Sequence, residues 1–173
     1  MKITFLIPPT LDGQRPAERS SGCTHVVYPT PNIYELTVAA LIEKSGEFNV
    51  AYHDFTYQKD SLEDFLSRDD SDFYSFWTVN LSIDTDLHAA QIIHSMKPDA
   101  YCLLLGPGPT YYINKCLNHE RTIVLRGEPD MVLLELLQAF RSGGEGDWQK
   151  VDGISFLKDG KVINNKPHAL LKN

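Results

Sequence analysis

Three short segments of this sequence carry residue types suited to holding a ligand, and each follows an apolar run. Asn80, Leu81 and Ser82 combine an amide and a hydroxyl, which donate and accept hydrogen bonds, with an apolar side chain. Residues 106–110 contain two glycines, which allow a bound molecule to approach the backbone closely. Residues 126–128 combine an arginine, a glycine and a glutamate. The chemistry indicated is ligand recognition through the backbone and a few polar side chains.

Each segment also has a structural interpretation. The two glycines can serve a tight turn between a strand and a helix, and Ser82 or Asp84 can cap the helix that follows. Arg126 and Glu128 can form a structural ion pair, or Glu128 can complement the dipole of the next helix. The spacing matches neither the G-x-G-x-x-G nucleotide fingerprint nor the G-x-x-x-x-G-K-[ST] phosphate loop. The residues alone leave both interpretations open.

No catalytic or metal-binding cluster accompanies these segments. None of the six histidines stands in an H-x-x-x-H or H-E-x-x-H pattern, so a zinc site is not predicted. Cys23 and His25 are a conceivable nucleophile and base, but no orienting or oxyanion-stabilising group can be named beside them. His25 is the histidine expected nearest to the ligand, because it lies in the long loop of residues 8–31. We assign no catalytic residue and no metal ligand.

Composition describes one domain with a sizeable core. The chain has 173 residues, of which 42% are hydrophobic, and a net charge of −7. That charge argues against nucleic acid and anionic membranes as partners, because both attract basic surfaces. Three widely spaced cysteines suggest no disulfide framework, which fits a cytoplasmic protein. No apolar stretch approaches the roughly 18 residues that span a bilayer, so membrane insertion is not expected.

Apolar runs alternate with helical patterns along most of the chain. Strands are predicted at residues 2–7, 49–54, 73–79, 100–105 and 122–125. Helices are predicted at residues 32–45, 61–66, 84–96, 111–118 and 131–141. Asp159-Gly160, between two alternating runs, then indicates a β-hairpin. We expect an α/β domain over residues 1–146, followed by a hairpin and linker over residues 147–173.

This alternation predicts an α/β fold of the flavodoxin-like or Rossmann-like, doubly wound type. Its five parallel strands are expected in the order 2-1-3-4-5. In such sheets ligands bind at the carboxyl ends of the strands, where the chain order reverses. The order places this switch point between the first and third strands. The loop of residues 8–31 and the segments 80–82 and 106–110 then border one crevice.

Several motifs occur in a fixed order along nearly the whole chain. The first strand ends in Pro8-Pro9, and a proline-rich loop ends in Pro29-Thr30-Pro31. A later strand runs into Gly106-Pro107-Gly108-Pro109-Thr110. Arg126-Gly127-Glu128 precedes an apolar helix, and the hairpin begins Gly153-Ile154-Ser155-Phe156. In this order the motifs resemble the N-terminal cobalamin-binding domain of cobalamin-dependent radical S-adenosylmethionine enzymes.

The resemblance implies a corrin ring over the carboxyl ends of the strands, with its nucleotide tail in the crevice. The chain would be the cobalamin-binding module of an enzyme that performs methyl transfer or radical rearrangement, without activity of its own. S-adenosylmethionine and a 4Fe-4S cluster would belong to a downstream radical S-adenosylmethionine barrel, the module's protein partner. The residues implied as neighbours of the cobalamin are Asn80, Leu81, Ser82, Gly106, Pro107, Gly108, Thr110, Arg126, Gly127 and Glu128.

Three patterns of cobalamin enzymes are absent. No D-x-H-x-x-G motif follows the first strand, and the resembled family generally lacks it too, so no histidine is assigned to cobalt. The family's usual Gly-Gly-Pro-His loop is replaced by Gly106-Pro107-Gly108-Pro109, in which Pro107 removes one backbone donor. The C-x3-C-x2-C triad that holds a 4Fe-4S cluster does not occur in the 173 residues. We therefore expect a fragment of a longer enzyme rather than a free-standing module.

Two other functional classes stay open. A cofactor-free, flavodoxin-like interaction or signalling module is compatible with the fold. Pro8-Pro9 and Asn80, however, occupy the places where a phosphate-receiving domain needs acidic residues. A small nucleotide-binding or flavin-binding protein would need a phosphate loop after the first strand. Thr10, Gly13 and residues 20–22 would have to supply that loop.

Overall fold

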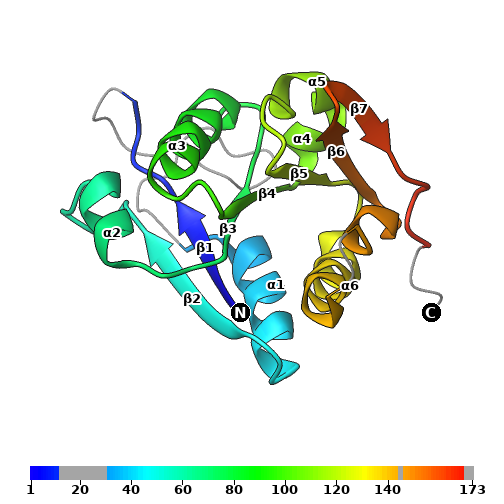
Figure 1. The fold of residues 1–173 in the computed structure, drawn as a ribbon. Coiled ribbons are helices and arrows are strands. Elements are labelled where there is room, and N and C mark those ends of the chain that lie inside the picture. The colour runs from blue at the N-terminus through cyan, green and yellow to red at the C-terminus, as the bar shows by residue number, and fades with distance from the viewer. Residues whose placement is uncertain (12–30, 144–145, 170–173) are drawn as a thin grey trace.

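The computed structural model describes residues 1–11, 31–143 and 146–169, and a seven-stranded sheet lies at its centre (Figure 1). Five of these strands are parallel and stand in the order β2-β1-β3-β4-β5. Their bounds are Lys2–Ile7 for β1, Asn49–Asp54 for β2, Phe73–Trp77 for β3, Tyr101–Leu105 for β4 and Thr122–Leu125 for β5. The predicted fold class and strand order are confirmed.

The predicted hairpin forms and joins the same sheet. It consists of β6 (Ile154–Lys158) and β7 (Lys161–Asn164), and its turn contains Asp159 and Gly160, both with positive φ. β6 pairs antiparallel with β5, so the hairpin extends the sheet beyond its last parallel strand. Ile154 and Phe156 are buried in the core, which ties the hairpin to the rest of the fold.

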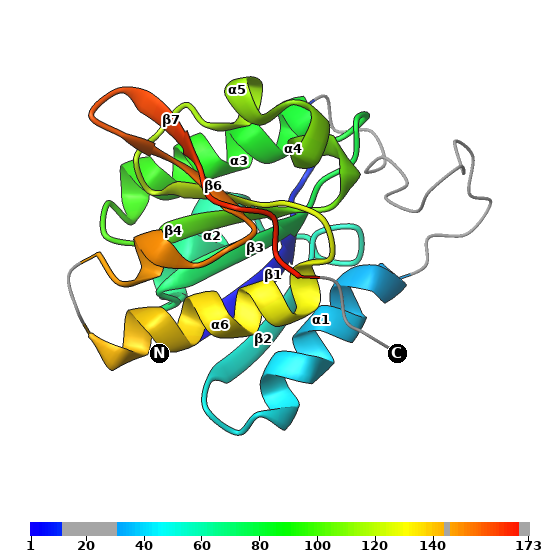
Figure 2. The ribbon, with the colours of Figure 1, turned by 90° about the vertical axis from the view of Figure 1, so that its right-hand side faces the viewer.

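Helices cover both faces of the sheet. One face carries α1 (Ile33–Lys44), α6 (Pro129–Ser142) and the short 3₁₀ turn η1 (Trp148–Lys150). The other carries α2 (Leu62–Arg68), α3 (Ile83–Met96) and α5 (Ile113–Cys116), with α4 (Pro107–Tyr111) next to α5. Figure 2 shows α1 and α6 on the side of the sheet opposite α3. Within the described ranges, no helix combines the length and apolar character needed to cross a membrane.

Local sequence signals explain most of these elements. Successive side chains of a strand point to opposite faces, so Phe5 packs in the core beneath α1 and α6 whereas Leu6 packs beneath α2 and α3. Asn32 caps α1, because its Oδ1 accepts the backbone N–H of Tyr34 at 3.1 Å. Ser61 caps α2 in the same way. Both helices therefore begin at a residue whose side chain caps the helix, as their sequences indicate.

The helix after β4 is the main difference from the sequence prediction. A helix was expected at residues 111–118, after a Gly/Pro loop, but α4 already begins at Pro107 and α5 ends at Cys116. Pro107 and Pro109 both fall in the first helical turn, where the backbone N–H groups have no partner within the helix. α6 begins at Pro129 for the same reason, two residues before its predicted start.

Candidate functional site

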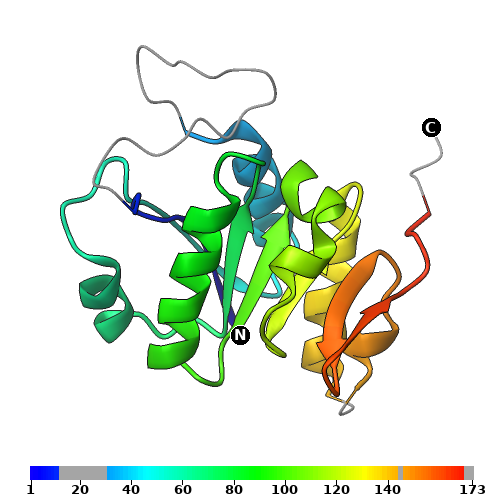
Figure 3. The ribbon, with the colours of Figure 1, turned by 90° about the horizontal axis from the view of Figure 1, so that it is seen from above.

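The carboxyl ends of the parallel strands form one edge of the sheet, at the opposite end from the N-terminus (Figure 3). β1 pairs with β3 only as far as Phe5 and Ser75, whereas β3 stays paired with β4 up to Trp77 and Leu105. The two strands beside the predicted switch point therefore part before β3 ends. The loops after β1 and β3 begin on either side of this point, where α/β folds bind their ligands.

The loop after β3 contains both exposed and buried residues. Asn80 and Leu81 are exposed, and Leu81 keeps 65% of its surface accessible. Ser82 is buried, where its Oγ accepts the Val79 N–H at 3.0 Å and donates to Asp86 Oδ2 at 2.9 Å. Ser82 stands at the N-cap of α3 without making a side-chain cap bond. Asn80 and Leu81 are therefore accessible to a ligand, and Ser82 holds the loop against the helix.

Thr78 is a residue of this edge that the sequence did not single out. Its backbone N–H donates to the Leu105 carbonyl at 2.8 Å, and its own carbonyl accepts the Gly108 N–H at 3.1 Å. Its side chain is fully buried, and Oγ1 has no hydrogen-bond partner among the residues that the structure describes. A threonine at the end of a strand is an ordinary sequence feature. Only the tertiary structure reveals that its hydroxyl is left unpaired.

The loop after β4 uses its glycines to pack against the loop after β3. A Cβ on Gly106 would lie 2.9 Å from the Thr78 carbonyl oxygen, and one on Gly108 would lie 3.0 Å from the Val79 carbonyl carbon. Gly106 also has φ 95° and ψ −172°, a conformation that is essentially restricted to glycine. Both glycines thus permit a close approach between two loops. That they also contact a ligand stays a prediction.

Beyond the glycines, α4 presents side chains to the surface. Pro107 is exposed, and Tyr111 and Tyr112 are 81% and 48% exposed. The Thr110 hydroxyl donates to the Gly106 carbonyl at 3.1 Å and so closes the first turn of α4. Of the predicted residues in this segment, Pro107 is exposed and accessible to a ligand. Thr110 forms a hydrogen bond within its own helix turn.

An aromatic stack connects the start of α1 with the end of β3. The rings of Tyr34 and Trp77 have centroids 5.1 Å apart and planes inclined by 9°. The Trp77 indole also lies against Gly106, where an added Cβ would be 3.3 Å from the ring. Elements α1, β3 and the loop after β4 are therefore held together beside the switch point. Tyr34 remains 46% exposed at this edge.

The segment after β5 has a different geometry from the predicted ion pair. The Arg126 guanidinium donates to the carbonyls of Ile154, at 3.1 Å, and Asn165. Burial lowers the pKa of this guanidinium. Glu128 is exposed and makes no ion pair in the part of the chain that the structure describes. Arg126 therefore connects the end of β5 with β6 and with the segment after β7, called here the tail, because it donates hydrogen bonds to backbone carbonyls of both.

A pocket of about 330 Å³ lies between this segment, the first turn of α6 and the tail. Its lining residues are Arg126, Gly127, Glu128, Asp130, Met131, Pro167, His168 and Ala169. Burial, followed by the charge of Glu128, raises the pKa of Asp130. Arg126, Gly127 and Glu128 are thus brought together at the carboxyl edge, one strand beyond the loop after β4.

Exposed apolar side chains gather at the carboxyl edge. Among the described residues, ten large hydrophobic side chains are exposed, and seven of them lie in the loops, turns or helix starts of this edge. These seven, called here the carboxyl-edge apolar residues, are Leu11, Ile33, Tyr34, Tyr57, Leu81, Tyr111 and Tyr112. The remaining three are Met1, Met96 and Ile163. Concentrations of exposed apolar side chains mark binding surfaces.

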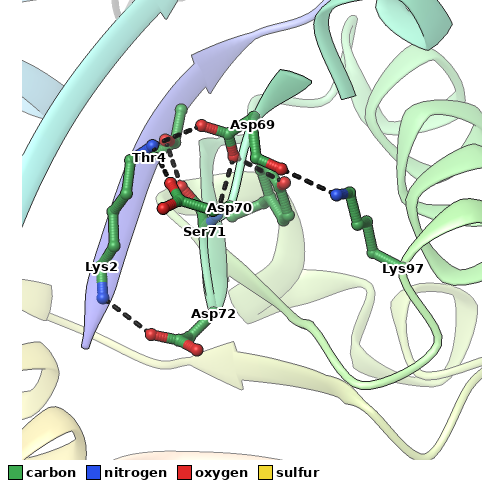
Figure 4. A network of polar contacts seen from close by, with 8 residues as sticks. Lys2, Thr4, Asp69, Asp70, Ser71, Asp72 and Lys97 are labelled. Carbon is green, nitrogen blue, oxygen red and sulfur yellow. Dashed lines mark hydrogen bonds and ion pairs between the residues drawn. The ribbon is translucent and has the colours of Figure 1, made fainter. Parts of the chain in front are cut away.

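The amino ends of the parallel strands form the opposite edge of the sheet, called here the amino edge. Polar groups at this edge are paired with one another (Figure 4). Lys2 Nζ lies 2.6 Å from Asp69 Oδ1, the Tyr74 hydroxyl donates to Asp69 Oδ2 at 2.7 Å, and Lys97 Nζ donates to the Asp69 carbonyl at 2.7 Å. Burial acts to raise the pKa of Asp69, but hydrogen bonds from Lys2, Tyr74 and Ser71 outweigh it and lower the pKa. These groups satisfy one another and hold β1 and β3 in place.

Among the described residues, the side chains with metal-binding or nucleophilic chemistry do not converge on the carboxyl edge. In the described ranges no three His, Cys, Asp or Glu residues are grouped to hold a metal ion. Cys102 and Cys116 are buried thiols, and burial raises the pKa of both, that of Cys116 to about 11. Neither is a thiolate at neutral pH. Cys23 and His25 lie outside the described residues.

Comparison with known proteins shows a distant sequence similarity to a longer protein. The chain is 22% identical, over 179 residues, to a protein of Pyrococcus horikoshii described as an uncharacterized methyltransferase. The similarity is distant. It extends over 100% of this chain and 36% of that methyltransferase, so the chain spans well under half of its relative. No family model matches the chain.

Proposed function

We propose that this chain binds cobalamin at the carboxyl edge of its sheet, as the cofactor-binding module of a longer, methyl-transferring enzyme. The observation that carries the proposal is the concentration of exposed apolar side chains at that edge. The distant similarity to a longer methyltransferase supports the assignment to methyl transfer. The finer assignment, to a radical S-adenosylmethionine enzyme, rests on the ordered sequence motifs.

The residues of this edge fit the chemistry of a corrin, a large ring with apolar faces and amide side chains around it. The carboxyl-edge apolar residues, among them Leu81 and Tyr111, offer contact to the ring. Within the described residues, three buried atoms have no hydrogen-bond partner and lie directly beside the ends of elements at this edge: Asn32 Nδ2 before α1, Thr78 Oγ1 after β3 and Arg126 Nε after β5. Each can donate to an amide carbonyl or a phosphate oxygen. A buried donor without an acceptor costs about 1–3 kcal/mol, and a bound ligand relieves that cost.

In this proposal the chain binds and orients the cofactor and keeps water from the covered face of the ring. Bound cobalamin supplies a cobalt centre that carries a methyl group between donor and acceptor. We assign no residue of the chain to cobalt, because the D-x-H-x-x-G motif is absent from the sequence. S-adenosylmethionine and a 4Fe-4S cluster are proposed for a further domain of the parent enzyme, which would also be the module's partner.

Hydroxocobalamin binding tests the proposal. The purified protein is mixed with hydroxocobalamin and passed through gel filtration, and the visible spectrum of the protein peak is recorded. We expect cobalamin absorbance at about one equivalent per chain. Leu81→Asp should weaken binding by at least about tenfold, or ~1.4 kcal/mol, because it places a charge against the ring. Met96→Asp changes an exposed apolar residue at the opposite edge and should bind like the wild type.

A colourless protein peak at saturating hydroxocobalamin would contradict binding by this chain alone. It would favour a second candidate, a cofactor-free module whose carboxyl edge contacts another protein. Four of the carboxyl-edge apolar residues are tyrosines, and exposed aromatic side chains are enriched at the centres of protein interfaces. Repeating the measurement on a longer chain that includes the downstream sequence separates this candidate from a cobalamin site that needs its neighbouring domain.

A further inference from the structure

The tail, described over residues 165–169, is bound to the rest of the domain chiefly through Asn165. The side-chain Nδ2 of this residue donates to the carbonyls of Gln149, at 2.8 Å, and Val151, at 2.6 Å. Its own backbone carbonyl accepts a hydrogen bond from the Arg126 guanidinium. An amide nitrogen has two hydrogens to donate, and here two carbonyl oxygens lie within reach of it. The position therefore requires a side chain that donates.

The backbone around Asn165 continues the antiparallel pairing past the end of β7. The Asn165 N–H donates to the Ile154 carbonyl at 3.0 Å, and the Gly153 N–H donates to the Lys166 carbonyl at 2.7 Å. Gly153 has no room for a side chain, because an added Cβ would lie 2.9 Å from the Cβ of His168. The tail thus lies closely against the loop between η1 and β6.

The attachment of the tail is weaker beyond Lys166. Pro167 has no backbone N–H to donate, and both Pro167 and Ala169 are exposed. Within the described residues, one polar contact joins this end of the tail to another element, between His168 Nε2 and Glu135 Oε1 at 3.2 Å. The Glu135 side chain is 45% exposed, so water competes for the contact. The tail therefore has a firmly held start and a loosely held end.

The loosely held end forms one wall of the pocket at the carboxyl edge. Pro167, His168 and Ala169 line this cavity of about 330 Å³, and its other lining residues come from the segment after β5 and the first turn of α6. Figure 2 shows the tail running past the start of α6. A displacement of residues 167–169 would therefore open the pocket while its other walls stay in place.

We propose that the tail controls access to this pocket. Asn165 anchors the start of the tail, and residues 167–169 move away from α6 to open the pocket and return to close it. Asn165 is a positioning residue in this arrangement, because it acts on the pocket only through the tail. The inference goes beyond the proposed function, since it concerns access to the pocket for any molecule and does not take cobalamin as the ligand.

Two isosteric substitutions at neighbouring positions test the anchor. Asn165→Asp replaces the donating nitrogen with an oxygen and so loses both side-chain bonds. Asn164→Asp is the matched control, because Asn164 Oδ1 accepts from Ser155 Oγ at 2.6 Å and a carboxylate oxygen accepts equally well. Hydrogen exchange of the Gly153 amide, measured by NMR, reports attachment of the tail. We expect exchange at least about tenfold faster in Asn165→Asp and within about twofold of the wild type in Asn164→Asp.

The amides of β4 distinguish local release of the tail from unfolding of the whole domain. They should keep their protection in Asn165→Asp, because β4 lies at the centre of the sheet. Unchanged exchange of the Gly153 amide in this variant would overturn the role of Asn165. Equal acceleration at Gly153 and in β4 would also contradict it, since the substitution would then act on the whole fold.

A thiol placed in the pocket tests whether the tail closes it. Met131 lines the pocket, and Met131→Cys in a Cys23→Ser chain provides the reporter, because the other two cysteines are buried. His168→Ala removes the contact with Glu135, and it should increase the rate of maleimide labelling about fivefold. His88→Ala changes an exposed histidine on α3 and should leave the rate within about twofold.

The labelling rates decide the inference independently of cobalamin. An unchanged rate in His168→Ala, or an increase that His88→Ala shares, would show that the tail does not control access to the pocket. Faster labelling in His168→Ala alone supports the inference, whether or not the wild type binds hydroxocobalamin. Failure of hydroxocobalamin to bind would overturn the proposed function and leave these results as they stand.

Discussion

Buried polar groups behave differently at the two edges of the sheet. At the amino edge the Asp69 carboxylate accepts hydrogen bonds from Lys2, Tyr74 and Ser71. At the carboxyl edge neither the Thr78 hydroxyl nor Arg126 Nε has a hydrogen-bond partner within the described part of the chain. Paired groups stabilise the fold, whereas unpaired ones leave hydrogen-bonding capacity for a ligand. The paired residues thus give the amino edge a structural role, and binding at the carboxyl edge stays a proposal.

Gly106→Ala should destabilise the protein strongly, by about 3 kcal/mol, because it combines backbone strain with a clash. Gly106 has φ 95°, and an added Cβ would lie 2.9 Å from the Thr78 carbonyl oxygen. Gly127 is the matched control, since its φ of 78° is also positive but an added Cβ meets nothing within 4 Å. Gly127→Ala should cost about 1–2 kcal/mol. Urea unfolding measures both values, and equal losses would show that contact with the loop after β3 does not matter.

His94 gives the stability a dependence on mildly acidic pH. Its ring stacks on His119 with centroids 3.8 Å apart, and its Nε2 shares a hydrogen bond with Thr122 Oγ1 at 3.0 Å. Burial, then the charges of His119 and Arg121, lower the pKa of His94 to about 4. The unfolded chain binds this proton near pH 6.5. The free energy of unfolding therefore falls as the pH drops from 6.5 toward 4.

His94→Gln should remove part of this pH dependence while keeping a group that can bond Thr122. Between pH 7 and pH 5 we expect the wild type to lose about 1 kcal/mol through His94, after allowance for the partial exposure of the ring. His53 acts in the same direction, because burial lowers its pKa too. Urea unfolding at the two pH values measures the difference. An unchanged pH dependence in His94→Gln would show that His94 is not the titrating group.

At the scale of elements, polar contacts fix how the strands enter the sheet and how the tail leaves it. Lys2, at the start of β1, is bound to Asp69, which lies between α2 and β3. Arg126, after β5, is bound to the backbone of Ile154 and Asn165. Asn165 also donates to the Val151 carbonyl at 2.6 Å. The first contact connects the start of β1 with the segment before β3, and the others connect the end of β5 with the hairpin and the tail.

Asp69→Asn should destabilise the protein by about 2–3 kcal/mol, because an amide in place of the carboxylate loses charge-assisted bonds to Lys2 and Tyr74. Asp70→Asn is the control. Asp70 also pairs with Lys2, but its side chain is 86% exposed, so the urea midpoint should barely change. The folded-state pKa of Asp69 is lowered. Its contribution is therefore present above its ordinary pKa of 3.8 and is lost as the pH falls below it. Similar midpoints for the two variants would contradict a buried anchor.

At the scale of the whole molecule, the proposed binding at the carboxyl edge involves loops that are far apart in the sequence. The loops after β1, β3, β4 and β5 belong to different parts of the chain, and unfolding separates them. A ligand that binds the folded protein alone stabilises it according to its concentration relative to Kd. The proposed function therefore has a consequence for thermal stability.

Hydroxocobalamin at about 100 times its Kd should stabilise the protein by ~2.7 kcal/mol. For a chain of 173 residues this corresponds to a rise in Tm of about 5–10 °C. Differential scanning calorimetry measures the rise, with Leu81→Asp as the control: if its binding is tenfold weaker, it should gain ~1.4 kcal/mol and show about half of the rise at the same concentration. A wild-type Tm that stays constant over all cofactor concentrations would exclude specific binding to the folded chain.

The sequence by itself determined the elements, their order and the edge at which a ligand is expected. Apolar runs, helical periodicity and Asp159-Gly160 report local structure, and the alternation of strands and helices restricts the topology to few choices. Asn32 and Ser61 were recognisable as caps because a cap acts within three residues. The start of α4 was missed because Pro107 resembles a loop residue until its place in the first turn is known.

Only the tertiary structure decided what the individual site residues contact. Gly106 and Gly108 lie against Thr78 and Val79, and Arg126 binds backbone carbonyls up to 39 residues away in place of Glu128. Such contacts depend on how the strands pair and how each loop folds back. Sequence patterns report which face a residue occupies but not which distant atom it meets. The unpaired Thr78 hydroxyl is a property of this packing, so it could be found only after the strands were in place.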